Sequence, residues 1–355
     1  MNNNSNYKPM RSGNGAISFL VDKRVLKVTL ILLFVTITTI LLSASKGEIN
    51  IPINEVFRTL IGQGQPIYNL TLLSLRLPRI ITALLVGASL AVSGAILQGI
   101  IRNPLTSPGI IGVTGGASAA VVGFISIFTS KDLSNSLSVS INWLPVVAFL
   151  GAAIVMFLVY FLAWKKGISP IRLVLIGIGV SAAMKALTTM MIVLSPIYLA
   201  SQAMLWLTGS IYAADWNDVL LILPWTVILL PLAFVYARDI NIQSLGDDIA
   251  SSVGSSVEKN RFILLLIAVG LAGAGVSVAG GIGFVGLVAP HMGRKLVGPN
   301  FEGLLPVSAL LGGLILLLAD FIARMAFAPL DIPAGIFTAI VGAPYFIYLL
   351  YQNSK

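Results

Sequence analysis

The stretch Arg238–Arg261, with the sequence RDINIQSLGDDIASSVGSSVEKNR, lies between two long apolar segments. Its polar composition predicts a loop outside the hydrocarbon of a membrane, and Gly254 divides it into two expected short helices at 244–252 and 255–261. A simple pore needs only a short turn here. We therefore interpret the loop as a docking surface on which a soluble partner pushes.

The composition excludes a water-soluble globule of this size. Of the 355 residues, 57% are apolar, 10% are charged and none is cysteine, so there is too little polar surface to cover a compact soluble fold. We expect an all-α, polytopic membrane protein with about ten spans of roughly 20 residues each. The ten segments are 28–44, 78–100, 110–128, 143–163, 172–195, 217–236, 262–280, 282–297, 304–326 and 333–351.

The basic residues indicate the orientation of the chain. When alternate loops are grouped, 15 of the 22 Lys and Arg residues fall on the side that holds both termini and the loop 238–261, six fall on the other side, and Lys185 lies within a span. Because Lys and Arg accumulate on the cytoplasmic side, we expect both chain ends and this loop in the cytoplasm. Orientation thus explains the net charge of +9 without a nucleic-acid partner.

The chain divides into a tail and one membrane domain. Residues 1–27 are rich in Asn and basic side chains, which predicts a flexible cytoplasmic tail, and residues 28–351 form a single transmembrane domain. The small residues Ser43–Ser45 could mimic a signal-peptidase site. However, an even number of spans agrees with the basic C-terminus only if the first span is retained.

A spacing of small residues predicts an internal repeat. Gly87-Ala88 and Gly94-Ala95 in the second span are echoed by Gly273-Ala274 and Gly280-Gly281 in the seventh. Because these spans are expected to run in opposite directions, spans two to five and seven to ten form a candidate inverted repeat. The alternative is that small residues simply let helices approach closely.

Two groups of motifs share their order with a known family. They are Leu75–Arg79 (LRLPR), Gly87–Gln98 and Asn103–Gly112 (NPLTSPGIIG), then Gly281–His291 (GIGFVGLVAPH), Leu317–Asp320, Ile332–Gly335 and Gly342–Pro344. From about residue 28 to 351 the chain resembles the permease subunits of ABC importers for iron-siderophores, haem and cobalamin. The resemblance implies a ten-helix permease domain.

The resemblance also implies a complex in the cytoplasmic membrane of a bacterium. Its other members would be a second permease subunit, identical or paralogous, two cytoplasmic ATPases and an extracytoplasmic substrate-binding protein. The sequence has no G-x-x-x-x-G-K-S/T phosphate loop. We therefore expect ATP and Mg²⁺ to bind to the partner ATPase, and no cofactor, metal or catalytic residue in this chain.

The polar loop is similar to the coupling helices of that family, which sit in a groove of the ATPase. A short helix can transmit a push only if it packs tightly, which favours small residues. The alternative is a solvated loop with ordinary helix caps. The predicted coupling residues are Ser244, Leu245, Gly246, Asp247, Ala250 and Gly254.

On the outer face, the resemblance implies that Arg76, Arg79 and Arg324 meet carboxylates of the binding protein. Such charge pairs orient a docked partner and speed its arrival more than they tighten the complex. The alternative is that all three arginines anchor helix ends at the headgroups, with Arg324 paired to Asp320 one turn away.

Four residues are candidates for the transport pathway. Asn103, Leu105 and Ser169 lie where spans two and five meet the cytoplasm, at the expected inner gate, although a helix-terminating turn is the plain alternative. Lys185 is a basic residue well inside a span, where desolvation is costly. It either lines the conduit, where it would favour an anionic chelate, or snorkels toward the surface.

A ferric siderophore is the expected cargo, with haem or cobalamin as alternatives that share the motifs. The sole histidine, His291, cannot build a metal site without strong ligands nearby, which favours a cargo whose metal is already coordinated. The different-class alternative is an ion-driven secondary transporter, which needs an intramembrane carboxylate. Asp320 is the candidate for that role.

Overall fold

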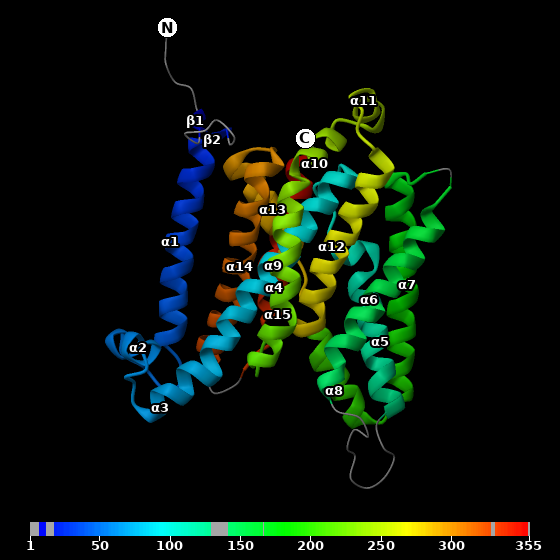
Figure 1. Ribbon diagram of the computed structural model, residues 1–355. Helices are drawn as coiled ribbons and strands as arrows, with labels where there is room; N and C mark the ends of the chain where they lie inside the picture. Colours follow the sequence, from blue (N-terminus) through cyan, green and yellow to red (C-terminus); the bar gives the residue numbers. More distant parts are fainter. Residues whose placement is uncertain (1–6, 12–17, 129–140, 166, 328–330, 354–355) are drawn as a thin grey trace.

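The computed structural model describes residues 7–11, 18–128, 141–165, 167–327 and 331–353. Within these residues the membrane part is entirely helical, as the sequence predicts. Figure 1 shows a bundle of long helices running in roughly the same direction, with short helices at both ends.

The segment before the first span contains more regular structure than we expected of a tail. Strands β1 (Tyr7–Arg11) and β2 (Ser18–Asp22) form an antiparallel pair, and helix α1 (Lys23–Ser45) follows directly. The Asp22 carboxylate accepts a hydrogen bond from the backbone N–H of Arg24 and caps the helix. This cap lets α1 begin among basic residues that hydropathy alone assigns to the tail.

A helix lies at each of the ten predicted segments (Figure 1). After α1 these are α4 (Leu77–Ile101), α5 (Val113–Phe128), α6 (Leu144–Ala163), α7 (Pro170–Leu194), α9 (Trp216–Val235), α12 (Val257–Ala279), α13 (Val285–Val297), α14 (Phe301–Ala326) and α15 (Ala334–Asn353).

Short elements connect them. They are α2 (Ile53–Leu60), α3 (Pro66–Asn69), a π-helical segment (Leu70–Arg76), 3₁₀ turns at Pro108–Ile111 and Ile141–Trp143, α8 (Ile197–Thr208), α10 (Ala237–Ser244) and α11 (Asp247–Ser252). The helix that contains α4 is continuous from Pro66 to Ile101, so it starts well before the predicted second span.

Eight helices in the described part of the chain are long and apolar enough to cross a membrane. The other two predicted spans, α5 and α13, are shorter: the 13 residues of α13 extend about 20 Å, against roughly 30 Å of hydrocarbon. Before α13, Gly280 and Phe284 both have positive φ, at 68° and 65°. An α-helix cannot continue through such a conformation, which explains why this span is short.

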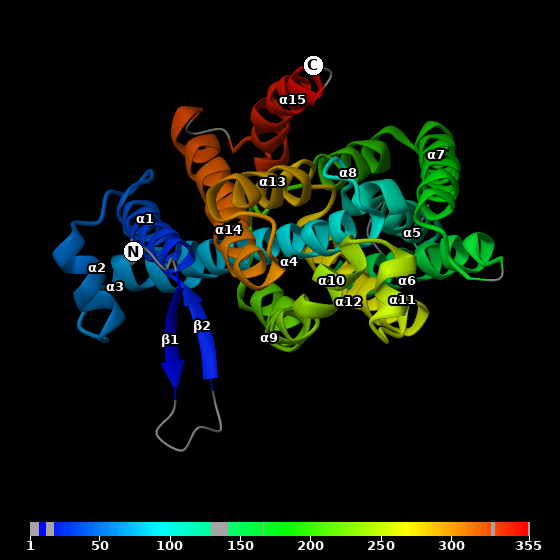
Figure 2. The same cartoon turned by 90° about the horizontal axis from the view of Figure 1, so that it is seen from above.

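Helix α4 runs obliquely through the middle of the bundle and packs against α9, α12, α13 and α14 (Figures 1 and 2). Two glycines of α4 make these contacts close. A side chain at Gly87 would collide with the backbone of Gly312, and one at Gly94 with the backbone of Gly286. Small residues therefore set the distance between these helices.

The contacts within the two halves correspond. Helix α4 packs on α14 and α12 packs on α6, while α5 contacts α6 and α7 as α13 contacts α14 and α15. An inverted repeat that relates α4–α7 to α12–α15 requires this pattern. The repeat itself stays a prediction.

Helices α7 and α15 lie at the edge of the bundle (Figure 2) and expose most of their apolar surface. The beginning of α1, the end of α15 and the pair α10–α11 lie at one end of the molecule, whereas α2, α3 and α8 lie at the other (Figure 1). We call these the inner and outer ends, following the predicted topology.

Candidate coupling and docking sites

At the inner end, the polar loop forms helices with boundaries that differ from those predicted. Helix α10 ends at Ser244, the chain breaks at Leu245 and Gly246, and α11 begins at Asp247. The predicted second helix is the first part of α12. Gly246 has φ of 123°, a conformation that only glycine adopts readily, so the helix cannot run through it as we predicted.

The two glycines of the loop are required by the backbone and not by packing. Gly246 and Gly254, with φ of 123° and 81°, bracket α11, and a Cβ at either would meet nothing within 4 Å. Within this chain the two glycines are therefore explained by their backbone conformation, and tight packing against an ATPase stays a prediction. Ala250 does fit that explanation, because it is fully buried against the bundle.

Asp247 lies between two arginines to which the sequence analysis assigned no role. Its Oδ1 accepts a hydrogen bond from the Arg261 guanidinium at 2.7 Å and another from Arg102. Arg261 also donates to the carbonyl of Ile168 at 2.5 Å, and Arg102 Nε donates to the carbonyl of Gln243 at 2.9 Å. This cluster joins α11 to the ends of three other helices.

At the outer end, the three arginines predicted for docking line one cavity of about 470 Å³. Arg76, Arg79 and Arg324 come from the helix Pro66–Ile101 and from α14, so the fold brings together what the sequence keeps far apart. Three carboxylates line the same cavity: Glu48, Asp215 and Asp331.

Arg76 is not a free charge at a rim. It lies in the π-helical segment, is buried, and donates hydrogen bonds to the carbonyls of Ala44 at 2.6 Å and Ile49 at 2.5 Å. These contacts tie the continuous helix to the end of α1. They leave Arg76 without a carboxylate partner among its described contacts.

Arg79 binds Asp320 through Nε and a terminal nitrogen, with N–O distances of 2.8 to 3.0 Å, and also binds Asp331 at 3.1 Å. Arg324 instead donates to the carbonyl and hydroxyl of Ser43, both at 2.9 Å. The alternative that Arg324 pairs with Asp320 is therefore wrong, because Arg79 engages both oxygens of that carboxylate.

The gate candidates divide into two places. Asn103 Oδ1 accepts a hydrogen bond from the backbone N–H of Leu105 at 2.9 Å, which is a local turn, and Ser169 is the residue before α7. The loop after α4 touches α7 farther along, where Ser181 Oγ donates to the carbonyl of Gly109 at 3.2 Å and Gly177 packs on Ile110. Gly177 and Ser181 are contacts that the sequence analysis missed.

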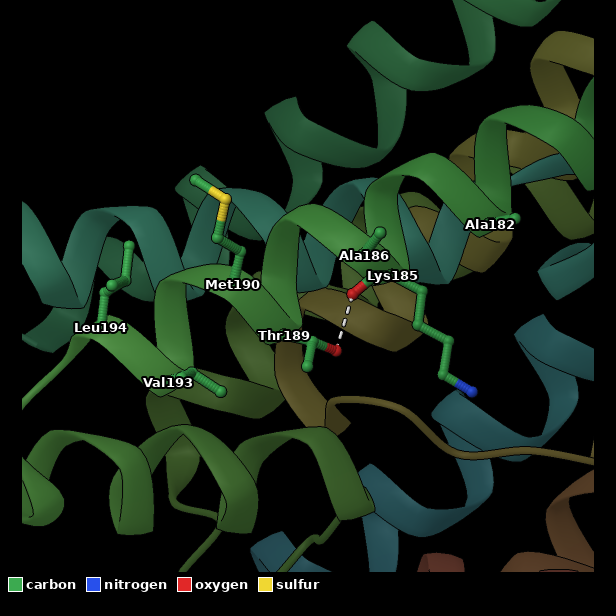
Figure 3. A pocket seen from close by; sticks show the side chains of 7 residues that line it. All are labelled: Ala182, Lys185, Ala186, Thr189, Met190, Val193 and Leu194. Carbon is green, nitrogen blue, oxygen red and sulfur yellow. Dashed lines mark hydrogen bonds between the residues drawn. The ribbon is translucent and has the colours of Figure 1, made fainter.

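Lys185 lies on the exposed face of α7, in an open depression of about 630 Å³ (Figure 3). The depression follows one side of the helix, and its other lining residues are apolar except Thr189, which donates to the Lys185 carbonyl at 2.9 Å. The Lys185 side chain is exposed within the described part of the chain, so its surroundings depend on what packs against α7.

His291 lies edge-on to the Tyr345 ring at a centroid distance of 5.9 Å, which links α13 to α15. In the described part of the chain, no group of three or more His, Cys, Asp or Glu side chains is placed to hold a metal ion. The contacts of His291 are those of a packing residue.

A bundle of long apolar helices, with an arginine-lined cavity at one end and the polar pair α10–α11 at the other, is the architecture of a polytopic membrane protein. The comparison with known proteins agrees: residues 33–352 match the model of the FecCD transport family. The chain belongs to this family.

Its relatives are permeases of iron uptake systems. The chain is 51% identical to the "Probable siderophore transport system permease protein YfhA" of Bacillus subtilis (strain 168), covering 94% of this chain and 96% of that protein. It is 47% identical to the iron(3+)-hydroxamate import system permease protein FhuG of the same organism, covering 92% and 96%. A solved metal-chelate type ABC transporter in an inward-facing conformation shares the fold, with a TM-score of 0.80, 30% identity and coverage of 92% and 99%.

Proposed function

We propose that this chain is the permease subunit of an ABC importer that moves a ferric-siderophore chelate across the cytoplasmic membrane. The observation that carries the proposal is the polar pair α10–α11 at the inner end of a FecCD-family bundle. The siderophore and hydroxamate permeases among its relatives support the choice of cargo. Haem and cobalamin remain the alternative cargoes.

The proposed complex contains a second permease subunit, two cytoplasmic ATPases and an extracytoplasmic binding protein. In this arrangement ATP and Mg²⁺ bind to the ATPases, and this chain conducts without catalysing. Helices α10 and α11 would lie in a groove of the ATPase, with both chain ends in the cytoplasm. The exposed residues Leu245, Ile249 and Val253 support contact with a partner, because they place apolar side chains on the surface of a polar loop.

The outer cavity is the proposed contact with the binding protein. A partner carboxylate that enters it meets Arg76, Arg79 and Arg324 together, although Arg79 is already bound by Asp320 and Asp331. In docking, a carboxylate of the binding protein would then replace Asp331 on Arg79. Asp331 is the exchangeable partner because its side chain is 28% exposed. Asp320, at 2% exposure, stays in place.

The conduit is proposed to run along α7 and α15. The position of Lys185 on an exposed face of α7 supports this, because an ionisable side chain that faces lipid is costly and one that faces a water-filled path is not. A second permease subunit facing them would enclose a path lined by Lys185 on the outer side and closed near Asn103, Leu105 and Ser169 on the inner side. Lys185 would then favour anionic chelates.

A secondary transporter is the weaker proposal. Its ion would have to bind Asp320, the intramembrane carboxylate that the sequence analysis singled out, but both oxygens of that group already accept hydrogen bonds from Arg79. A group held in this way provides structure more readily than ion binding.

The test is uptake of radio-iron on hydroxamate, catecholate and citrate chelators by cells that lack this chain and by cells in which it is restored. Loss of one class that returns on restoration supports the proposal. If no iron chelate responds, the same cells are tested with haem and cobalamin. Uptake that persists when ATP is depleted but the membrane potential is kept would instead support a secondary transporter.

A further inference from the structure

Two arginines at the inner end connect α11 to the membrane bundle. Arg261, on α12, has a side chain that is only 1% exposed, and Arg102 follows the last residue of α4. Both donate to the same oxygen of Asp247, whose side chain is 42% exposed. The buried partner is thus a cation of the bundle, and the exposed partner is the first residue of a surface helix.

Arg261 extends this connection to α7. Its second terminal nitrogen donates to the carbonyl of Ile168, the residue directly before Ser169 and the start of α7. The backbone N–H of Ile168 in turn donates to the carboxylate of Glu258 at 3.2 Å, and Glu258 lies 3.9 Å from Arg261. Ile168 is therefore held on both sides by groups of α12.

Arg102 makes the corresponding connection to α4 and α10. It adopts a left-handed backbone conformation, with φ of 57°, at the residue where α4 ends. This conformation is uncommon for a residue with a side chain, and it places the guanidinium against the carbonyl of Gln243 and against Asp247. One carboxylate thus faces the ends of α4, α10 and α12.

Because the two glycines at the ends of α11 make no side-chain contacts, the contact of Asp247 with the two arginines is a main attachment of α11. Gly246 and Gly254 have positive φ and open surroundings. No side-chain contact at these two residues therefore holds α11 against the bundle. Helix α11 is fixed to the bundle chiefly through the buried side of Ala250 and through Asp247. Without Asp247, the buried guanidinium of Arg261 would keep Glu258 only at 3.9 Å, beyond hydrogen-bond distance, so the pair with Asp247 resists separation.

We propose that Asp247, Arg261 and Arg102 form a clamp that carries the displacement of α11 to the inner ends of α7 and α4. The inference rests on the proposed function, in which an ATPase moves α11, and it names the route by which that movement reaches the conduit. Asp247 and the two arginines are positioning residues. They touch neither cargo nor nucleotide.

The first experiment measures distance and needs no cargo. The chain contains no cysteine, so spin labels at Ser252→Cys on α11 and Ile171→Cys on α7 report one distance in the full-length protein in detergent or lipid. The clamp predicts a narrow distance distribution that broadens in Asp247→Asn. Asp248→Asn is the matched control, since it removes the same charge from the neighbouring residue of α11, and it should leave the distribution narrow.

The second experiment compares uptake with ATP hydrolysis in the complex of this chain with its ATPase. The substrate is the ferric chelate whose uptake is lost without this chain and regained when the chain is restored. Asp247→Asn is expected to keep ATP hydrolysis while uptake per ATP falls about tenfold, within the usual range of coupling between sites. Asp247→Glu and Arg261→Lys, which keep the charges, should recover part of this loss.

The outcomes are separable. An unchanged distance distribution in Asp247→Asn, or uptake per ATP equal to that of Asp248→Asn, overturns the clamp. If the wild-type chain neither imports a chelate nor associates with an ATPase, the proposed function fails, while the distance measurement still decides whether α11 and α7 are joined. If Asp247→Asn does not reach the membrane, Arg102→Gln is measured instead, because it removes one charge of the clamp from a partly exposed side chain. A distance distribution as narrow and uptake per ATP as high as in Asp248→Asn would then contradict the proposal.

Discussion

Two arginine–carboxylate centres lie at opposite ends of α4, and they differ in whether the carboxylate is buried. At the outer end the side chains of Asp320 and Arg79 are both largely buried, at 2% and 11% exposure, beside a cavity that the arginines line. At the inner end Arg261 is 1% exposed and the carboxylate of Asp247 is half exposed on a short surface helix. Arg79 and Arg102 mark the two ends of α4, roughly 35 Å apart at about 1.5 Å per residue.

The difference shows which partner is fixed in each centre. A buried, fully bonded charge costs several kcal/mol to separate from its partner and stays with the bundle, whereas an exposed one can move or exchange at little cost. The outer centre therefore keeps Arg79 and Asp320 together, and the partly exposed Asp331 is the acid that can exchange. The inner centre keeps its arginine and holds an acid on the surface helix α11, the element that we propose to move.

The largest expected effect is at the fixed acid of the outer centre. Asp320→Ala leaves Arg79 with only the partly exposed Asp331, and we expect a loss of about 3–5 kcal/mol of stability, the usual cost of breaking a buried pair. Thermal unfolding of the purified protein measures it. Asp331→Asn is the control and should cost less than about 1 kcal/mol; equal effects of the two substitutions would remove the distinction between fixed and exchangeable acids.

The next effect concerns the inner hinge. Gly246→Ala should strain the backbone by about 1–3 kcal/mol, because alanine does not readily adopt φ of 123°, and should lower uptake while ATP hydrolysis continues. Gly62→Ala is the matched control, since Gly62 also has positive φ and open surroundings but lies between α2 and α3. If Gly62→Ala lowers uptake per ATP by the same factor, strain alone explains the result.

A smaller effect is expected at the wall of the outer cavity. Arg324→Gln leaves the Arg79–Asp320 pair intact and should weaken docking of the binding protein about three- to tenfold at low salt, with a smaller difference at high salt. Affinity measured over a salt series tests this. Arg58→Gln, on an exposed arginine paired with Glu55, should change nothing, and an Arg324→Gln affinity equal to wild type at low salt would contradict docking at this cavity.

The smallest effect is expected at the exposed face of α7. Lys185→Met should reduce uptake of an anionic chelate by about two- to fivefold, which corresponds to roughly 0.5–1 kcal/mol, and should leave a neutral chelate unaffected. Parallel uptake of the two chelates measures the ratio. An equal change for both would favour a snorkelling lysine outside the conduit.

Much of the fold followed from hydropathy, because lipid forces every backbone group of a span into a helix. The ten helices lie where the apolar segments predicted them, although α5 and α13 are too short to cross alone. The boundaries in the polar loop were wrong, since Gly246 and Gly254 act through positive φ. A glycine permits a positive φ but does not require it, so the local sequence does not predict this conformation.

The candidate sites were only partly predictable. Motif order pointed to Arg76, Arg79 and Arg324, but not to their partners at Ala44, Asp320 and Ser43, which come from distant segments. Arg102 and Arg261 carried a weak signal, as basic residues at the ends of apolar spans beside polar loops. Nothing in the sequence indicated that both would bind Asp247.

By itself the sequence determined that this protein is a polytopic helical membrane protein of the permease type, and on which side its polar loop and termini are expected. These conclusions depend on composition and on local order, which need no knowledge of contacts. Only the tertiary structure decided which charges are buried and which are exposed, because burial depends on helices that are far apart in the chain. That distribution makes Asp320 a fixed support at one end of α4 and Asp247 a point of attachment at the other.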